Sequence, residues 1–107
     1  MRVIIPNKKG VEETRRIVER STEDLFRSAT GGIVQIKDVQ KSWSGDTMSF
    51  SFNAGVAFLS TPIQGTVEVT EKEVVIDVVI PEAFRRFISE DKLKFGIETR
   101  VRGLLSQ

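Results

Sequence analysis

The residue types that most often carry out chemistry in proteins are scarce in this chain. It has no histidine and no cysteine among its 107 residues. This composition excludes serine–histidine triads, cysteine nucleophiles, and zinc sites built from imidazole or thiolate ligands. No glycine-rich run precedes a Lys-Ser or Lys-Thr pair, so a phosphate-binding loop of the P-loop type is also missing. We therefore expect no catalytic residue, no metal site and no cofactor, and we predict that the protein is not an enzyme.

One carboxylate and one aromatic residue stand out as candidates for a site. Asp77 interrupts the otherwise apolar run from Val74 to Ile80, and burial in such a run would raise the pKa of its carboxyl group. Asp77 is the best candidate for a perturbed carboxylate, although exposure to solvent or an Arg or Lys partner explains it more simply. Trp43 could stack on a ligand, but its place at a strand end before a turn is more typical of a core or rim residue.

Arginines recur along the chain and could bind an anionic ligand, such as a coenzyme or a nucleic acid. They include Arg15, Arg16, Arg20, Arg85, Arg86, Arg100 and Arg102. Acidic residues are interleaved with them, and the 16 basic residues nearly balance the 15 acidic ones. This pattern is typical of solvated helix faces. We therefore expect no nucleic-acid partner.

The strongest candidate for a contact site lies between Gly55 and Pro62. Val56 and Phe58 continue the alternation of the preceding residues, so both could enter the core if the strand simply runs longer. Leu59 breaks that alternation. Adjacent residues in an extended segment point to opposite sides, so at least one of Phe58 and Leu59 is expected to be exposed. A projecting loop here would give this apolar pair access to a partner surface.

Hydrophobic periodicity predicts the elements that position these residues. Strands are expected at 3–5, 33–43, 47–54, 63–70 and 74–80, and helical segments at about 11–28 and 84–105. The longest turn-like stretch is 53–62. The alternation slips near Asp38, which predicts a bulge or bend, and Ser89 could cap a restarted helix. Phe84, Phe87 and Ile88 are expected to share one helix face.

Together these elements predict an α+β fold in one domain, residues 1–107. An antiparallel meander of four to five strands would carry the N-terminal helix and a long C-terminal helix on one face, like a reduced helix-grip fold. The N-terminal strand should pair beside the strand 74–80, which is expected near the sheet centre because it is apolar on both faces. Phe50, Phe52, Ile76 and Val101 are expected to be buried.

Several segments also resemble a known family. They are Arg2-Val3-Ile4-Ile5-Pro6 before a charged helix, the hairpin Trp43–Phe50, and Ile63–Val69 before a valine-rich strand that ends at Ile80-Pro81. In these segments, which span nearly the whole chain, the sequence is similar to the small proteins of the polyhydroxyalkanoic acid system family. The resemblance implies a bacterial protein linked to polyhydroxyalkanoate storage granules. It implies no defined activity and no catalytic residues.

The expected location and partners follow from these features. The apolar run at Val3–Ile5 is too short for a signal peptide, and no later run approaches the length of a membrane span. We expect a cytoplasmic protein without a transmembrane segment. The function that fits best is a non-enzymatic accessory or interaction protein associated with granules, in contact with a granule protein or an apolar polymer surface. The alternatives are a small apolar-ligand-binding domain of helix-grip type and a homo-oligomer that associates through an exposed sheet face or edge.

Overall fold

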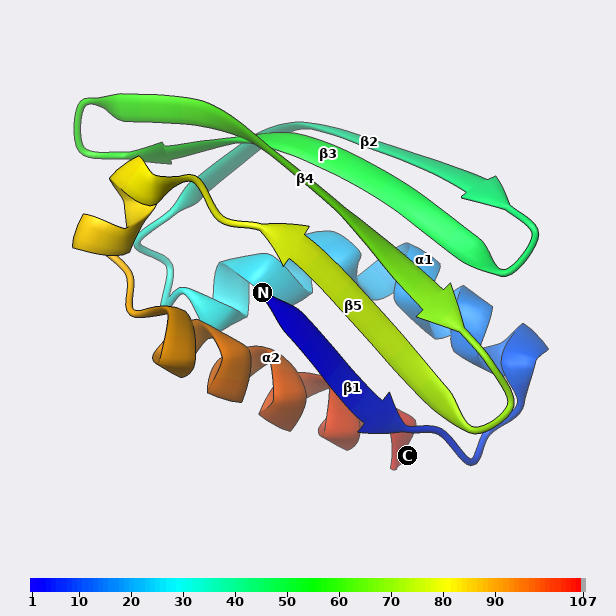
Figure 1. The fold of residues 1–107 in the computed structure, drawn as a ribbon. Helices are drawn as coiled ribbons and strands as arrows, with labels where there is room; N and C mark the ends of the chain where they lie inside the picture. The colour runs from blue at the N-terminus through cyan, green and yellow to red at the C-terminus, as the bar shows by residue number, and fades with distance from the viewer. Residues whose placement is uncertain (107) are drawn as a thin grey trace.

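The computed structural model describes residues 1–106 and consists of a five-stranded antiparallel sheet with both α-helices on one face (Figure 1). The elements are β1 (Arg2–Pro6), α1 (Val11–Ala29), β2 (Gln35–Ser44), β3 (Thr47–Val56), β4 (Leu59–Val69), β5 (Glu73–Val79), the 3-10 helix η1 (Glu82–Arg86) and α2 (Glu90–Leu105). The α+β class, the meander and the placement of both helices on one face are confirmed.

The strand order in the sheet is β1-β5-β4-β3-β2. β2 to β5 form the meander, and β1 pairs with β5, as predicted. In this pairing Val3 lies opposite Ile76. The strand 74–80 was expected near the sheet centre, and β5 is an interior strand that pairs with β1 on one side and with the central strand β4 on the other. The expectation that it is apolar on both faces holds only in part: on its outer face Val75 is buried, whereas Asp77 and Val79 are exposed.

The core lies between the sheet and the two helices. Alternate residues of β3 point into it, and the same side chains define the face that the helices cover. The β3 core residues are Met48, Phe50, Phe52, Ala54 and Val56, and α2 contributes Leu93, Ile97 and Val101. All four residues that were expected to be buried, Phe50, Phe52, Ile76 and Val101, are buried. The two helices approach closely at Gly96, where an added Cβ atom would lie 3.3 Å from the Ala29 backbone.

The C-terminal helical region is divided into two pieces. Ser89 has an extended backbone and caps α2, and its hydroxyl accepts a hydrogen bond from the Lys92 amide at 3.4 Å. This N-cap was predicted from the sequence. The expectation that Phe84 and Phe87 share a buried helix face was wrong. η1 is a short 3-10 helix that ends at Arg86, and Phe84 is buried while Phe87 is half-exposed.

The predicted irregularity near Asp38 is a bulge in β2. The pairing of β2 with β3 shifts register between Lys37 and Gln40. Asp38 itself has a φ of 56°, in the left-handed region that residues with a side chain seldom adopt. Its carboxylate accepts a hydrogen bond from the Asn53 side-chain amide at 3.0 Å, which holds the bulge against β3.

Candidate functional site

The turn between β3 and β4 is much tighter than the sequence predicts. The ladder continues until Val56 lies opposite Leu59, so only Ala57 and Phe58 are outside the strands. The expected turn-like stretch 53–62 was therefore wrong in its extent. Ala57 has a φ of 54°, as expected in a two-residue hairpin whose twist matches the strands. The geometry of this turn determines the directions of the Val56, Phe58 and Leu59 side chains.

Phe58 and Leu59 differ in exposure because of this turn. Val56 enters the core, but Phe58 does not follow it, since the turn ends the strand alternation after Val56. Phe58 projects from the turn with 107% of its reference surface exposed. Leu59 is half-buried and packs against the core. The expectation that at least one of the pair is exposed is confirmed, and the exposed one is Phe58.

A second exposed phenylalanine lies beside this turn. Phe87, which follows η1, is 51% exposed. Phe58 and Phe87 line one open hollow of about 880 Å³ between the β3–β4 turn and η1. Its other lining residues are Ala57, Leu59, Glu82, Ala83, Arg85 and Arg86. We call Phe58, Phe87 and this hollow the aromatic tip.

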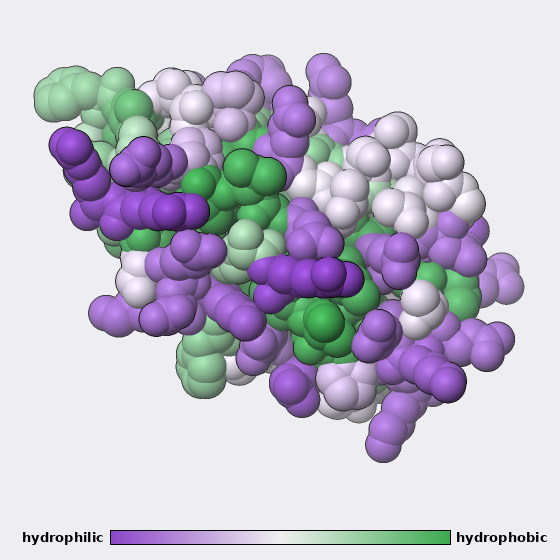
Figure 2. All heavy atoms as spheres, viewed as in Figure 1, coloured by the Kyte–Doolittle hydropathy of each residue, from purple (hydrophilic) through white to green (hydrophobic). Residues whose placement is uncertain are grey.

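The aromatic tip occupies one end of the molecule. In Figure 1 the β3–β4 turn extends past the helices and η1 lies beside it. Figure 2 shows apolar side chains at this end, directly above strongly hydrophilic ones. Phe58 also lines a smaller hollow of about 230 Å³ that includes Ile33, which is 61% exposed. Phe58 thus borders two hollows, and little of its ring is covered by the protein.

Sequence reasoning missed Phe87 as a member of this site. Its helical spacing from Phe84 predicts a core position. Its proximity to Phe58 arises from the tertiary fold, because the end of β5 delivers η1 to the same end of the sheet as the β3–β4 turn. The only local signal was Pro81 together with Ser89, which bracket a segment too short for a full α-helix.

Asp77 lies on the face of the sheet that the helices leave uncovered. Its side chain is 52% exposed, and the carboxylate lies 3.8 Å from the Arg2 guanidinium. This is the solvent-exposed, arginine-paired environment that explained Asp77 most simply. The uncovered face around it is lined by small polar side chains, including Ser49, Ser51 and Thr66, over an open hollow of about 640 Å³.

Trp43 is a rim residue that ties the edge strand to α1. Its indole N–H donates to a Glu19 carboxylate oxygen at 2.8 Å, and the Arg15 guanidinium carbon lies 4.7 Å from the ring centroid. Arg15 also approaches the Asp46 carboxylate at 3.8 Å. Since both the indole N–H and a face of the ring have partners within the protein, Trp43 is engaged in structure.

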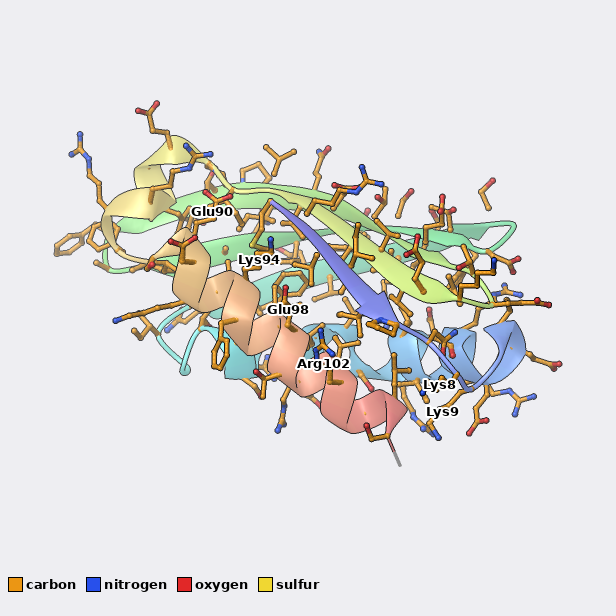
Figure 3. The ribbon with its side chains drawn as sticks, turned by 60° about the horizontal axis from the view of Figure 1, so that its bottom comes forward. Lys8, Lys9, Glu90, Lys94, Glu98 and Arg102 are labelled. Atoms are coloured by element: carbon orange, nitrogen blue, oxygen red, sulfur yellow. The ribbon has the colours of Figure 1, made fainter. Side chains whose placement is uncertain are left out.

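The remaining charged residues are spread over solvated surfaces. Along α2, Glu90, Lys94, Glu98 and Arg102 follow one another down one side of the helix with alternating charge (Figure 3). Such four-residue spacing of opposite charges stabilises a helix. Within residues 1–106, no cluster of three or more acidic side chains could hold a metal ion.

The aromatic tip is therefore the candidate site, and it has the character of a contact surface. None of the helices in the described part of the chain is both long and apolar enough to cross a membrane. No family model, curated protein or solved structure matches the chain.

Proposed function

We propose that this protein is a non-catalytic interaction domain that attaches to an apolar surface through its aromatic tip. The observation that carries the proposal is the complete exposure of Phe58 at the end of a two-residue turn. Burying a phenylalanine side chain contributes roughly 1.5–3 kcal/mol, and no part of residues 1–106 covers Phe58. The half-exposed Phe87 beside it enlarges the apolar area available to that partner.

The surface that we propose is that of a polyhydroxyalkanoate granule in the cytoplasm. The support for this choice is the sequence resemblance at the N-terminal strand, the Trp43–Phe50 hairpin and the Ile63–Val69 strand. A granule is an extended apolar body, and a projecting aromatic pair suits such a surface because it needs no matching pocket. Attachment through one end of the molecule would leave the polar sheet face in contact with water.

The alternative, a domain that encloses a small apolar ligand, requires a cavity between sheet and helices. The two apolar cavities that line this interface have volumes of about 30 and 20 Å³. Each has room for about one water molecule. The core that Phe26, Phe52 and Phe84 help to form is thus filled, which favours contact with a partner at the surface over enclosure of a ligand.

The test is binding of purified protein to particles of poly(3-hydroxybutyrate), measured by sedimentation. The variant Phe58→Ser, Phe87→Ser removes both exposed rings of the aromatic tip. We expect it to lose most of the bound fraction while its thermal unfolding changes little. Phe95→Ser is the matched control, because Phe95 is 69% exposed on α2 and lines neither hollow beside Phe58.

Two results would contradict the proposal. One is equal binding by the native protein and the double variant. The other is an equal loss of binding in Phe95→Ser, since that would show a general dependence on surface hydrophobicity.

A further inference from the structure

The charges around the aromatic tip indicate which kind of apolar surface it fits. Arg85 and Arg86 line the same hollow as Phe58 and Phe87. Arg85 lies 3.6 Å from the Glu90 carboxylate. Arg86 is exposed and has no hydrogen-bond or ion-pair partner within residues 1–106. Two guanidinium groups therefore flank two exposed aromatic rings.

An uncharged surface offers these guanidinium groups no partner, so there they would stay hydrated at the edge of the contact. At a surface with anionic headgroups the same residues assist. Each basic residue close to such a surface strengthens binding by about fivefold, and the planar guanidinium fork matches phosphate oxygens in pairs.

We propose that the aromatic tip docks on a phospholipid layer with anionic headgroups. Phe58 and Phe87 would enter the boundary between headgroups and acyl chains, which is the depth that aromatic side chains favour. Arg85 and Arg86 would then lie at the level of the phosphates, with their aliphatic stems against the apolar region. This inference rests on the proposed function, because it uses the same aromatic tip. It adds the chemistry of the surface that the tip contacts.

The hollow of the aromatic tip also contains a negative charge, and this allows a test in which two substitutions have opposite expected effects. Among the described residues that line the hollow, Glu82 is the only acidic one. If the partner surface is anionic, Glu82 weakens docking while Arg86 strengthens it. A contact that depends on apolar area alone would respond to neither charge. Substitutions at these two positions should therefore change vesicle binding in opposite directions.

The experiment measures co-sedimentation with vesicles of phosphatidylcholine alone and of phosphatidylcholine mixed with phosphatidylglycerol. We expect binding only to the mixed vesicles, a fall of about fivefold in Arg86→Gln, and a rise of about the same size in Glu82→Gln. Binding should weaken as salt is added. Arg20→Gln is the matched control, since Arg20 is an exposed arginine on α1 away from the tip, and it should bind as the native protein does.

The outcomes separate this inference from the proposed function. Equal binding to both kinds of vesicle, or no change in Arg86→Gln and Glu82→Gln, would overturn the headgroup assignment. Binding of the polymer particles that still depends on Phe58 would then leave the proposed function standing. Loss of binding in Arg20→Gln equal to that in Arg86→Gln would also overturn the assignment, because it would show attraction by overall charge. Thermal unfolding of each variant establishes that it is folded.

Discussion

Five of the seven phenylalanines of this protein lie in two contrasting regions. Under the sheet, Phe26, Phe50 and Phe52 form a cluster with ring centroids 5.2–6.1 Å apart, and all three are buried. At the aromatic tip, Phe58 and Phe87 expose half or more of their surface and have an open hollow between them. The same residue type thus stabilises the fold in one region and is available to a partner in the other. The difference predicts that stability and binding can be altered separately.

The largest effect on stability should come from removing a ring from the buried cluster. Phe52→Ala deletes a side chain that contacts both Phe26 and Phe50, and we expect the free energy of unfolding to fall by about 3–5 kcal/mol. Denaturant melts followed by circular dichroism would measure it. A loss below about 1 kcal/mol would mean that the cluster is not the centre of the core.

A methyl group added beside the cluster should also be costly. A Cβ atom at Gly65 would lie 2.5 Å from the Phe50 ring and 2.5 Å from the Asp77 carbonyl oxygen, so Gly65→Ala should destabilise the fold by about 1–3 kcal/mol. Gly55→Ala is the control, because its nearest neighbour would be 3.8 Å away, and there the stability should stay level or rise by up to about 1 kcal/mol. Similar melts for the two variants would show that Phe50 is not packed on Gly65.

Trp43 lies between the two regions in exposure and should have an intermediate effect. Trp43→Phe keeps a ring but removes the hydrogen bond to Glu19, and we expect a loss of about 0.5–1.5 kcal/mol. A double-mutant cycle with Glu19→Ala would isolate the contribution of this pair to the free energy of unfolding. A coupling energy indistinguishable from zero would show that the hydrogen bond between Trp43 and Glu19 does not stabilise the fold.

The smallest change in stability should follow substitution at the tip. Phe58→Ser removes a ring that contacts little of the protein, and its free energy of unfolding should stay within about 0.5 kcal/mol of the native value. Thermal and chemical melts would both measure it. A destabilisation comparable with that of Phe52→Ala would show that Phe58 is covered by its own chain in solution and cannot serve as a contact residue.

Much of the fold could be predicted because its signals are local. The two-residue alternation identified the buried face at Phe50 and Phe52, the slip in that alternation located the bulge at Asp38, and Ser89 marked the start of α2. Each of these features depends on residues within one turn or strand. The pairing of β1 with β5 and the placement of the helices on one face were also predicted, because the polar faces of the strands 47–54 and 63–70 cannot be buried cheaply.

The candidate site could be predicted only in part, because half of it depends on tertiary structure. The break in alternation at Leu59 identified the pair Phe58 and Leu59, but it did not tell which of the two is exposed. Phe87 was not identified, because its neighbours suggest a helix face and its contact with the same hollow arises from the path of the chain after β5. The arginines of η1 were interpreted as part of a solvated surface because acidic residues are interleaved with the arginines of this chain. The charge pattern of the sequence does not predict that these arginines lie beside Phe58 and Phe87.

The bulge at Asp38 has a consequence for how molecules of this protein meet one another. β2 is a long edge strand, and a straight edge of this kind offers unpaired backbone groups on which a strand from another chain can add. The left-handed residue interrupts that edge between Lys37 and Gln40. An incoming strand could follow the edge only up to the bulge from either side. The bulge therefore limits how far strands from other molecules can extend the sheet at the β2 edge.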